Sequence, residues 1–181
     1  MRYISHRGNV IGPELSSENS VAHVTTALNI GLEVEIDVWK TFAHEHGAGS
    51  IFLGHDGPDH KVSLDFLHHY KDRLWCHAKN FTALEFLIKN NFNCFWHDQD
   101  DYTITSHGQI IHHERLTNLS MSLYKNSVVI FSEAHIALAE SMSIETKVYG
   151  VCSDYIHQLR SDPELYSSDL TCVVGKSNDR R

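Results

Sequence analysis

The sequence lacks features that would place the chain in several common functional classes. Basic residues are not in excess, because 15 Lys and Arg stand against 23 Asp and Glu, with a formal net charge of -8. A general nucleic-acid surface needs clustered Lys and Arg to displace counterions, so this balance argues against one. No apolar stretch is long enough to span a bilayer, and Met1 leads into a first strand without the apolar core of a signal peptide. We therefore expect a cytoplasmic protein without a membrane span.

Cysteine is scarce, and its placement excludes further classes. The four residues, Cys76, Cys94, Cys152 and Cys172, each lie within an apolar run, and no CxxC pair indicates zinc. They are typical of buried thiols in a reducing compartment. The sequence also has no internal repeat, low-complexity segment or long linker. With 41% hydrophobic residues in a chain of 181, we expect a single domain, residues 1–181, with a substantial core.

Histidine, in contrast, is abundant, with 15 residues. Only His6, His55, His77 and His97 end apolar runs. The others, His113 among them, lie in polar or amphipathic contexts, where we expect surface or core positions. Position along the predicted strands therefore separates the candidates for chemistry from the rest.

Residues 4–56 repeat one arrangement, an apolar run that ends in acid, base or imidazole. In the middle run the side-chain period of two places Leu32, Val34, Ile36 and Val38 on one face, and Glu33, Glu35, Asp37 and Trp39 on the other. Adjacent carboxylates repel each other unless a cation or hydrogen bonds offset the repulsion. A solvated antiparallel strand with a polar outer face is the alternative. The flanking pairs, His6-Arg7 and His55-Asp56, favour a chemical site.

Short apolar runs alternate with helical patterns along the chain, which is typical of parallel β/α units. We expect strands at 3–6, 32–38, 50–55, 74–78, 92–96, 127–132, 148–153 and 170–174, a hairpin at 102–112, and helices at 18–31, 82–90, 134–141 and 155–159, with a helical turn at 64–70. Residues 41–50 are too short and too rich in glycine for a crossover helix. The strands on either side of them are expected to form an antiparallel hairpin or a crossover without its helix. Residues 177–181 are expected to fray.

This pattern predicts an α/β fold of reduced size. A (β/α)8 barrel usually needs roughly 250 residues, so we expect a reduced TIM-type (β/α) barrel of seven or eight strands with shortened or missing helices. If the barrel closes, the strand ends converge on one rim and bring together His6, Glu35, Asp37, His55, His77 and Lys79. His97-Asp98 and Glu133 end strands at the same rim and are weaker candidates for lining a substrate pocket.

Four short motifs in the first third of the chain follow a recognisable order. They are His6-Arg7-Gly8, Ser17-Glu18-Asn19-Ser20, Glu35-Ile36-Asp37-Val38 and Gly54-His55-Asp56. In this order they resemble the glycerophosphodiester phosphodiesterase family, within the superfamily of phospholipase C-like phosphodiesterases. Residues 148–155 also resemble a late barrel strand of that family. Its fourth-strand motif of acidic residue, any residue and lysine is met in part, because His77-Ala78-Lys79 has histidine in place of the metal-binding carboxylate.

The chemistry of phosphodiester cleavage gives each of these residues an expected role. Cleavage at neutral pH needs neutralisation of the phosphoryl oxygens, a base and an acid. His6 and His55 are expected to be the acid and base, in an order that the sequence leaves open. Glu35 and Asp37 offer oxygen ligands to Mg2+ or Ca2+, and His77, as third ligand, would favour Mn2+. Alternatively, His77 contacts the substrate phosphate, which Arg7 and Lys79 are expected to bind.

The resemblance implies a metal-dependent phosphodiesterase with two-histidine acid-base catalysis and a substrate hydroxyl that attacks to give a cyclic phosphate. The substrate would be a small molecule: a glycerophosphodiester or a related polyol or lipid-headgroup phosphodiester. The alternative is a catalytically degenerate barrel that binds a phosphorylated sugar or lipid headgroup, as the small size and His77 suggest. Retention of both His6 and His55 favours the enzyme.

Other interpretations are open for single residues. His6 and His55 as buried histidines bonded to backbone are one alternative. Glu18 and Asn19 are better explained as a pair that starts a helix and braces a loop than as metal ligands. The oligomeric state is open.

Overall fold

The computed structural model describes residues 1–42, 49–113, 125–133 and 148–160. Its strands are β1 (Arg2–His6), β2 (Glu33–Lys40), β3 (Ile51–Leu53), β4 (His60–Val62), β5 (Leu74–Ala78), β6 (Cys94–Phe95), β7 (Tyr102–Ile104), β8 (Ile110–His112), β9 (Ser127–Phe131) and β10 (Gly150–Ser153). Its helices are α1 (Val21–Asn29), α3 (Leu64–His69), α4 (Phe81–Lys89), α6 (Ile156–Leu159) and the 3-10 helix η1 (Lys71–Arg73). The helix expected at 134–141, the strand at 170–174, the tail at 177–181 and Cys172 lie outside the described residues.

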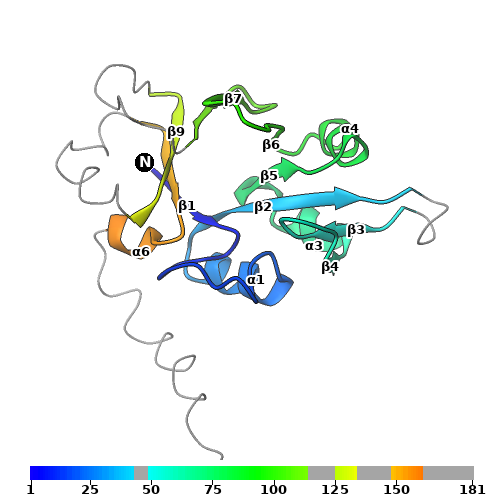
Figure 1. The fold of residues 1–181 in the computed structure, drawn as a ribbon, viewed down its shortest axis with the longest axis horizontal. Helices are drawn as coiled ribbons and strands as arrows, with labels where there is room; N and C mark the ends of the chain where they lie inside the picture. Colours follow the sequence, from blue (N-terminus) through cyan, green and yellow to red (C-terminus); the bar gives the residue numbers. More distant parts are fainter. Residues whose placement is uncertain (43–48, 114–124, 134–147, 161–181) are drawn as a thin grey trace, which may run out of the picture.

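Parallel pairing dominates the sheet. The order β6-β5-β2-β1-β10-β9-β8 is parallel throughout, so the carboxyl ends of these strands lie along one edge. Strands from the two ends of the described chain lie side by side, as β1 and β10 do in Figure 1. Antiparallel strands occur at the margins, where β3 pairs with β2, β4 with β3, and β7 with β8. Side chains at the carboxyl ends of these parallel strands can therefore contribute to one site.

The expected TIM-type barrel is wrong, because the described residues form an open mixed sheet of ten strands with few helices. In the part of the chain that the structure describes, β6 has two residues and pairs with β5 alone. Within the described residues, Ser106 joins it to the neighbouring hairpin by hydrogen bonds: the Ser106 N–H donates to the Cys94 carbonyl over 2.7 Å, and the Cys94 N–H donates to Ser106 Oγ over 3.0 Å. These bonds form no strand ladder, so the sheet keeps its edges.

The hairpin predictions are confirmed. β2 pairs antiparallel with β3, with Val38 opposite Leu53, which is one of the two arrangements left open for this connection. The hairpin of β7 and β8 is present as well, with Gly108 in its turn at a φ of 87°. β4 was not expected, because three residues are too few to give a periodic signal.

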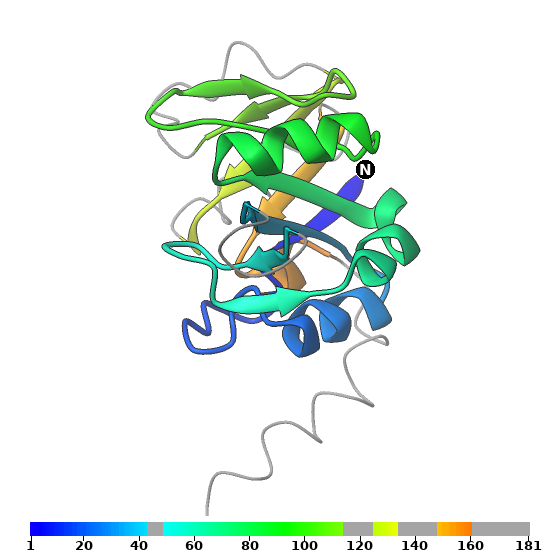
Figure 2. The same ribbon diagram turned by 90° about the vertical axis from the view of Figure 1, so that its right-hand side faces the viewer.

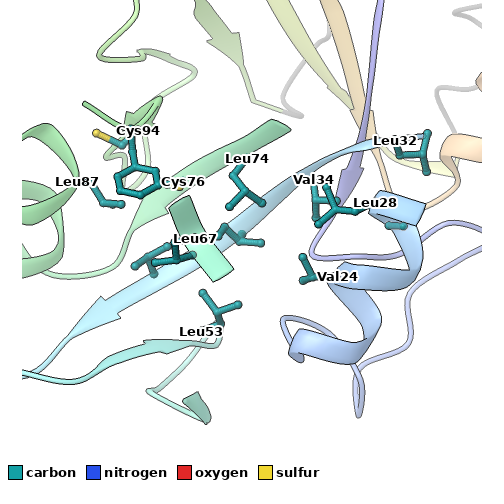
Figure 3. Packing of buried hydrophobic residues seen from close by; sticks show 14 of the residues in the cluster. Val24, Leu28, Leu32, Val34, Leu53, Leu67, Leu74, Cys76, Leu87 and Cys94 are labelled. Carbon is teal, nitrogen blue, oxygen red and sulfur yellow. The ribbon is translucent and has the colours of Figure 1, made fainter. Parts of the chain in front are cut away.

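Helices cover the outer face of the sheet. α1 begins after Ser20, whose side chain accepts a hydrogen bond from the His23 N–H, and α4 begins after Asn80, whose side chain caps it in the same way. Their apolar sides bury Val24, Ala27, Leu28, Ala83 and Leu87 against the strand face that carries Val34, Ile36 and Val38. Figure 3 shows Val24 and Leu28 beside Val34, and Figure 2 shows α4 (green) above and α1 (blue) below, with strands between them.

The inner face of the sheet carries two layers of side chains. The first is apolar and consists of Ile4, Trp75, Phe95, Ile111, Val128 and Cys152. Because the period of a strand is two, the next residues on the same face toward the carboxyl ends are His6, His77, His97, His113, Ile130 and Asp154. The sheet thus places a predominantly polar layer directly after an apolar layer.

Burial settles the status of the carboxylates and of the thiols. Glu35 and Asp37 are 5% and 0% exposed, so the alternative of a solvated polar strand is wrong. Cys76, Cys94 and Cys152 are buried free thiols, as expected, and burial raises the pKa of Cys76 and Cys152 well above the usual range.

In the part of the chain that the structure describes, no helix has the length and apolar character needed to cross a membrane.

Candidate functional site

One pocket of about 350 Å³ brings the predicted site residues together. Its lining includes six of the seven: His6, Arg7, Glu35, His55, His77 and Lys79. The seventh, Asp37, is fully buried beside them and contacts Arg7, His77 and Lys79. The convergence expected at the strand ends is therefore confirmed, although the sheet that produces it is open.

Two of the sequence motifs contain a glycine at a position where a side chain would not fit. Gly8 has a φ of 92°, and a Cβ there would lie 2.6 Å from Cδ2 of His23. A Cβ at Gly54 would lie 2.1 Å from the carbonyl oxygen of Gly57. Side chains at these two positions would therefore displace the turns that carry Arg7 and His55 into the pocket.

Asp37 is the centre of charge of the site. Its Oδ2 lies 2.9 Å from Arg7 Nε and accepts a hydrogen bond from Asn19 Nδ2 over 2.9 Å. Its Oδ1 lies 3.0 Å from His77 Nδ1 and 3.5 Å from Lys79 Nζ. Burial alone would raise the pKa of Asp37, but the hydrogen bond from His77 and the positive charge of Arg7 hold it well below its usual range. Asp37 is therefore ionised at neutral pH.

Glu35 occupies the same strand face two residues earlier. Burial and the neighbouring charge of Asp37 raise the pKa of Glu35. Its Oε2 lies 3.9 Å from His6 Nε2, and its Oε1 lies 3.9 Å from His77 Nδ1, too far for hydrogen bonds. The Glu35 carboxylate therefore makes no hydrogen bond to His6 or His77 and can coordinate a cation.

The donor set of Glu35, Asp37 and His77 fits a divalent cation. One ligand atom from each residue lies within 4.8 Å of the others. Among the described residues, Glu35 Oε2 is buried without a hydrogen-bond partner, whereas Asp37 Oδ1 faces His77 and Lys79. Burial of a carboxylate oxygen is costly unless a cation or donors compensate it. The 3.0 Å between His77 Nδ1 and Asp37 Oδ1 suits two ligands of one ion and also suits a direct hydrogen bond.

His6 is held by a carboxylate from the far end of the described chain. Its Nδ1 lies 2.8 Å from Asp154 Oδ1, which also accepts a hydrogen bond from Asn9 Nδ2 over 2.7 Å. Burial lowers the pKa of His6, but the hydrogen bond to Asp154 and the charge of Glu35 outweigh it and raise the pKa above 6.5. Since Nδ1 is held by Asp154, Nε2 is the atom left to exchange a proton with a ligand.

His55 is held in a similar way by its neighbour in the motif. Its Nδ1 lies 2.7 Å from Asp56 Oδ1, and its side chain is 46% exposed. Both strand-end histidines therefore pair with carboxylates, and the alternative of buried histidines bonded to backbone is wrong. Each ring presents Nε2 as its second nitrogen.

Arg7 and Lys79 line the pocket, but neither has its charge free for phosphate alone. Arg7 pairs through Nη1 with Glu18 over 3.1 Å as well as with Asp37. Glu18 also accepts a hydrogen bond from Asn9 Nδ2. The side-chain amide of Asn19 donates from Nδ2 to Asp37 Oδ2 and accepts at Oδ1 from the Asp37 N–H. Glu18 and Asn19 thus brace the loop, as expected, and fix the position of Arg7.

A stack of aromatic rings lines another part of the pocket. His77 stacks on Phe95 with ring centroids 4.9 Å apart and on His97 at 4.7 Å, and His97 stacks on His113 at 3.6 Å. Burial and the charges of His77 and Lys79 lower the pKa of His97 to about 4. Burial and the neighbouring His97 lower the pKa of His113 to about 4 as well. Both rings are therefore neutral near pH 7.

Sequence reasoning assigned no role to Asp154, Asn9 and His113. Asp154 directly follows the expected strand at 148–153, so its strand-end position was a usable signal, but its partner His6 was not apparent. His113 follows β8 on the inward face, whereas its polar sequence context predicts no chemical role. His97 and Asp98 line the pocket as the weaker candidates predicted, whereas the described lining does not include Glu133.

No family model, curated protein or solved structure matches the chain. The functional argument therefore depends on the residues of the site and on their geometry.

Proposed function

We propose that the chain is a metal-dependent phosphodiesterase that hydrolyses a glycerophosphodiester or a related polyol or lipid-headgroup phosphodiester. The observation that carries the proposal is the convergence of two carboxylate-paired imidazoles, two cations and a buried pair of carboxylates around one pocket. The order of the four motifs, which resembles that of glycerophosphodiester phosphodiesterases, supports the same reaction.

The residues of the pocket divide the reaction between them. Glu35, Asp37 and His77 would hold the cation, which when bound would neutralise charge on the phosphoryl oxygens. Arg7 and Lys79 neutralise Asp37 and orient the phosphate at the same wall of the pocket. The charges of Arg7 and Lys79 balance those of the buried carboxylates Glu35 and Asp37. The positive charge of a bound cation would then attract a phosphodiester anion.

Proton transfer takes place at Nε2 of the two histidines. One imidazole takes the proton from a neighbouring hydroxyl of the substrate while that oxygen forms its bond to phosphorus. The other imidazole gives a proton to the leaving oxygen as its bond to phosphorus breaks. Water then opens the cyclic phosphate with the two roles reversed, so both imidazoles return to their starting states.

A second candidate function is binding of a phosphorylated sugar or lipid headgroup without turnover. The observation that favours it is His77, which stands where the resembled family has a third carboxylate and so leaves the site less negative by one charge. A binder, however, has no need for two carboxylate-paired histidines.

The two candidates are separated by assay of the purified chain against a panel of glycerophosphodiesters with Mg2+, Ca2+ or Mn2+. The double variant His6→Ala/His55→Ala is the matched control for contaminating activity. Turnover that the double variant lacks supports the phosphodiesterase. Tight binding of phosphorylated ligands with no turnover under any metal supports the binder.

A further inference from the structure

Asn9 is fully buried and has no part in the proposed proton transfer or in the candidate cation site. Its Nδ2 donates hydrogen bonds to Glu18 Oε1 over 2.9 Å and to Asp154 Oδ1 over 2.7 Å. Its Oδ1 accepts hydrogen bonds from the Glu14 N–H and from His23 Nε2, each over 3.1 Å. An amide has two N–H donors and an oxygen with two lone pairs, so these contacts use its full hydrogen-bonding capacity.

The partners of the amide fix its orientation. Ionised carboxylates only accept hydrogen bonds, so they must face the NH2 group, whereas the Glu14 N–H only donates and must face the oxygen. The backbone of Asn9 is held separately, because its N–H donates to the His6 carbonyl over 2.9 Å and its carbonyl accepts from Ser5 Oγ over 2.7 Å. A change of side chain at this position therefore removes the amide contacts and leaves the backbone anchors of the turn in place.

The two carboxylates that share the NH2 group orient different residues of the pocket. Asp154 Oδ1 lies 2.8 Å from His6 Nδ1. Glu18 Oε2 accepts a hydrogen bond from Arg7 Nη1 over 3.1 Å. The side chains of Glu18 and Asp154 are 9% and 28% exposed, so the two carboxylates would repel each other if the shared donor were absent. The NH2 group of Asn9 thus links the carboxylate that orients the imidazole to the one that orients the guanidinium.

We propose that Asn9 is a positioning residue that sets the placement of His6 relative to Arg7. This inference rests on the proposed function, which gives His6 a role in proton transfer and Arg7 a role in phosphate binding. A proton passes between His6 Nε2 and a substrate oxygen only within hydrogen-bond reach, and a misplacement of about 1 Å can lower a rate about 100-fold. By aligning both residues, one buried amide keeps a phosphate at Arg7 within reach of His6.

The two contacts of the NH2 group predict separate effects on kcat and KM. Loss of the bond to Asp154 frees the carboxylate that orients His6, which should lower kcat. Loss of the bond to Glu18 frees the carboxylate that orients Arg7, which should weaken phosphate binding and raise KM. Asn9 should therefore act on kcat through Asp154 and on phosphate binding through Glu18, whereas a residue that only stabilises the fold would show neither dependence.

Double-mutant cycles on the full chain test both dependences. We expect Asn9→Ala to lower kcat about tenfold or more in the wild type, and less than about twofold when Asp154→Ala is already present. Calorimetric titration of inorganic phosphate in the presence of Mg2+ needs no turnover. In it, Asn9→Ala should weaken binding about fivefold in the wild type, and less than about twofold beside Glu18→Ala.

Two further variants separate the NH2 donor from the bulk of the side chain and from general destabilisation. Asn9→Asp keeps the size of the side chain but turns a third carboxylate oxygen toward Glu18 and Asp154, so it should lose at least as much as Asn9→Ala. The matched control is Asn90→Ala, which removes a side-chain amide that bonds the Phe86 carbonyl at the end of α4. It should change neither kcat nor phosphate affinity.

Wild-type kcat and phosphate affinity in Asn9→Asp would overturn the positioning role. So would effects of Asn9→Ala that persist in full beside Asp154→Ala and Glu18→Ala. If either variant of Asn9 does not fold, Asn9→Ser takes its place under the same criteria.

The positioning role and the phosphodiesterase can fail separately. Phosphate binding that depends on Asn9 through Glu18, without hydrolysis of any diester, would keep the positioning of Arg7 and refute the phosphodiesterase. Hydrolysis in which the effects of Asn9→Ala are additive in both cycles would keep the phosphodiesterase and overturn the positioning role. A wild type that neither binds phosphate nor cleaves a diester would overturn both.

Discussion

His6 and Asp154 are 148 residues apart in the sequence, yet Nδ1 of the histidine donates a hydrogen bond to Oδ1 of the carboxylate over 2.8 Å. The contact exists because β1 and β10 are adjacent parallel strands, with Ser5 in register with Ser153. Asn9 donates to the same oxygen and fixes the carboxylate in place. The pair orients the ring so that Nε2 is available on the side of Glu35.

Asp154→Asn tests this pair through the pH dependence of the reaction. The hydrogen bond to Asp154 helps to raise the pKa of His6 above 6.5, so removing the negative charge should lower that pKa. We expect the limb of the kcat profile that reports His6 to move to lower pH, with KM little changed. Asp56→Asn, which alters the partner of His55, should leave that limb in place. An unchanged profile in Asp154→Asn would show that the contact is not functional.

The same linkage predicts how stability depends on pH. A folded pKa above 6.5 means that protonated His6 stabilises the fold fully below pH 6.5, and that this contribution is lost as pH rises through the folded value. The difference in free energy of unfolding between wild type and Asp154→Asn should therefore be larger at acidic than at alkaline pH within the range where Asp154 stays ionised. Urea unfolding at several pH values measures it, and a difference that grows with pH contradicts the assignment.

Removal of either strand-end imidazole should abolish turnover without unfolding the chain. His6→Ala and His55→Ala each remove one partner in proton transfer, and such losses cost on the order of 10²-fold or more in rate. Steady-state kinetics on an unactivated diester give the effect, and thermal unfolding gives the control. Near-full activity in either variant would refute the two-histidine mechanism.

Glu35→Gln should weaken metal affinity more than it affects thermal stability. Glu35 Oε2 is buried without a hydrogen-bond partner among the described residues, so an amide removes ligand charge without breaking a hydrogen bond at that oxygen. Titration of Mg2+ and Mn2+ into the variant, followed by calorimetry, gives the affinity. The matched control is Glu85→Gln, which alters an exposed carboxylate on α4 that pairs with Lys89. Equal metal affinity in Glu35→Gln and wild type would remove Glu35 from the proposed ligand set.

His77→Glu separates the two roles open to His77. An imidazole ligand favours Mn2+ and later transition ions over Mg2+, so a gain in Mg2+ affinity in the variant identifies a ligand position. Lost turnover with unchanged metal affinity identifies a contact to the substrate phosphate beside Lys79. If neither quantity changes, the correspondence of His77-Ala78-Lys79 with the fourth-strand motif is wrong.

Local sequence was sufficient to choose most of the residues that lie together around the candidate site. His6 and Lys79 lie at or next to the carboxyl ends of parallel strands, and such ends meet whether or not the sheet closes. Glu35 lies within β2 in register with His6, and His55 follows β3, which pairs antiparallel with β2. The alternation of Glu33, Glu35 and Asp37 predicted a polar inner face, and this face is buried. Strand position and period were therefore enough to choose these residues.

What local sequence could not predict is long-range pairing. Closure of the sheet depends on hydrogen bonds between β6 and the β7–β8 hairpin, and Ser106 supplies only a few of them. No sequence pattern in residues 92–112 predicts that these hydrogen bonds are too few to close the sheet. Asp154 and His113 were likewise missed because their partners, His6 and His97, come from other strands.

The central claim is that the pocket hydrolyses a polyol phosphodiester with the help of a divalent cation. Its most direct test follows a glycerophosphodiester by 31P NMR with chelator-treated protein, before and after addition of Mg2+, Ca2+ or Mn2+. We predict that the diester signal persists in chelator and gives way to a phosphomonoester, by way of a cyclic phosphate, once metal is restored. An unchanged rate of cleavage in chelator would contradict the role of the metal, and a diester that persists with every metal would contradict the phosphodiesterase itself.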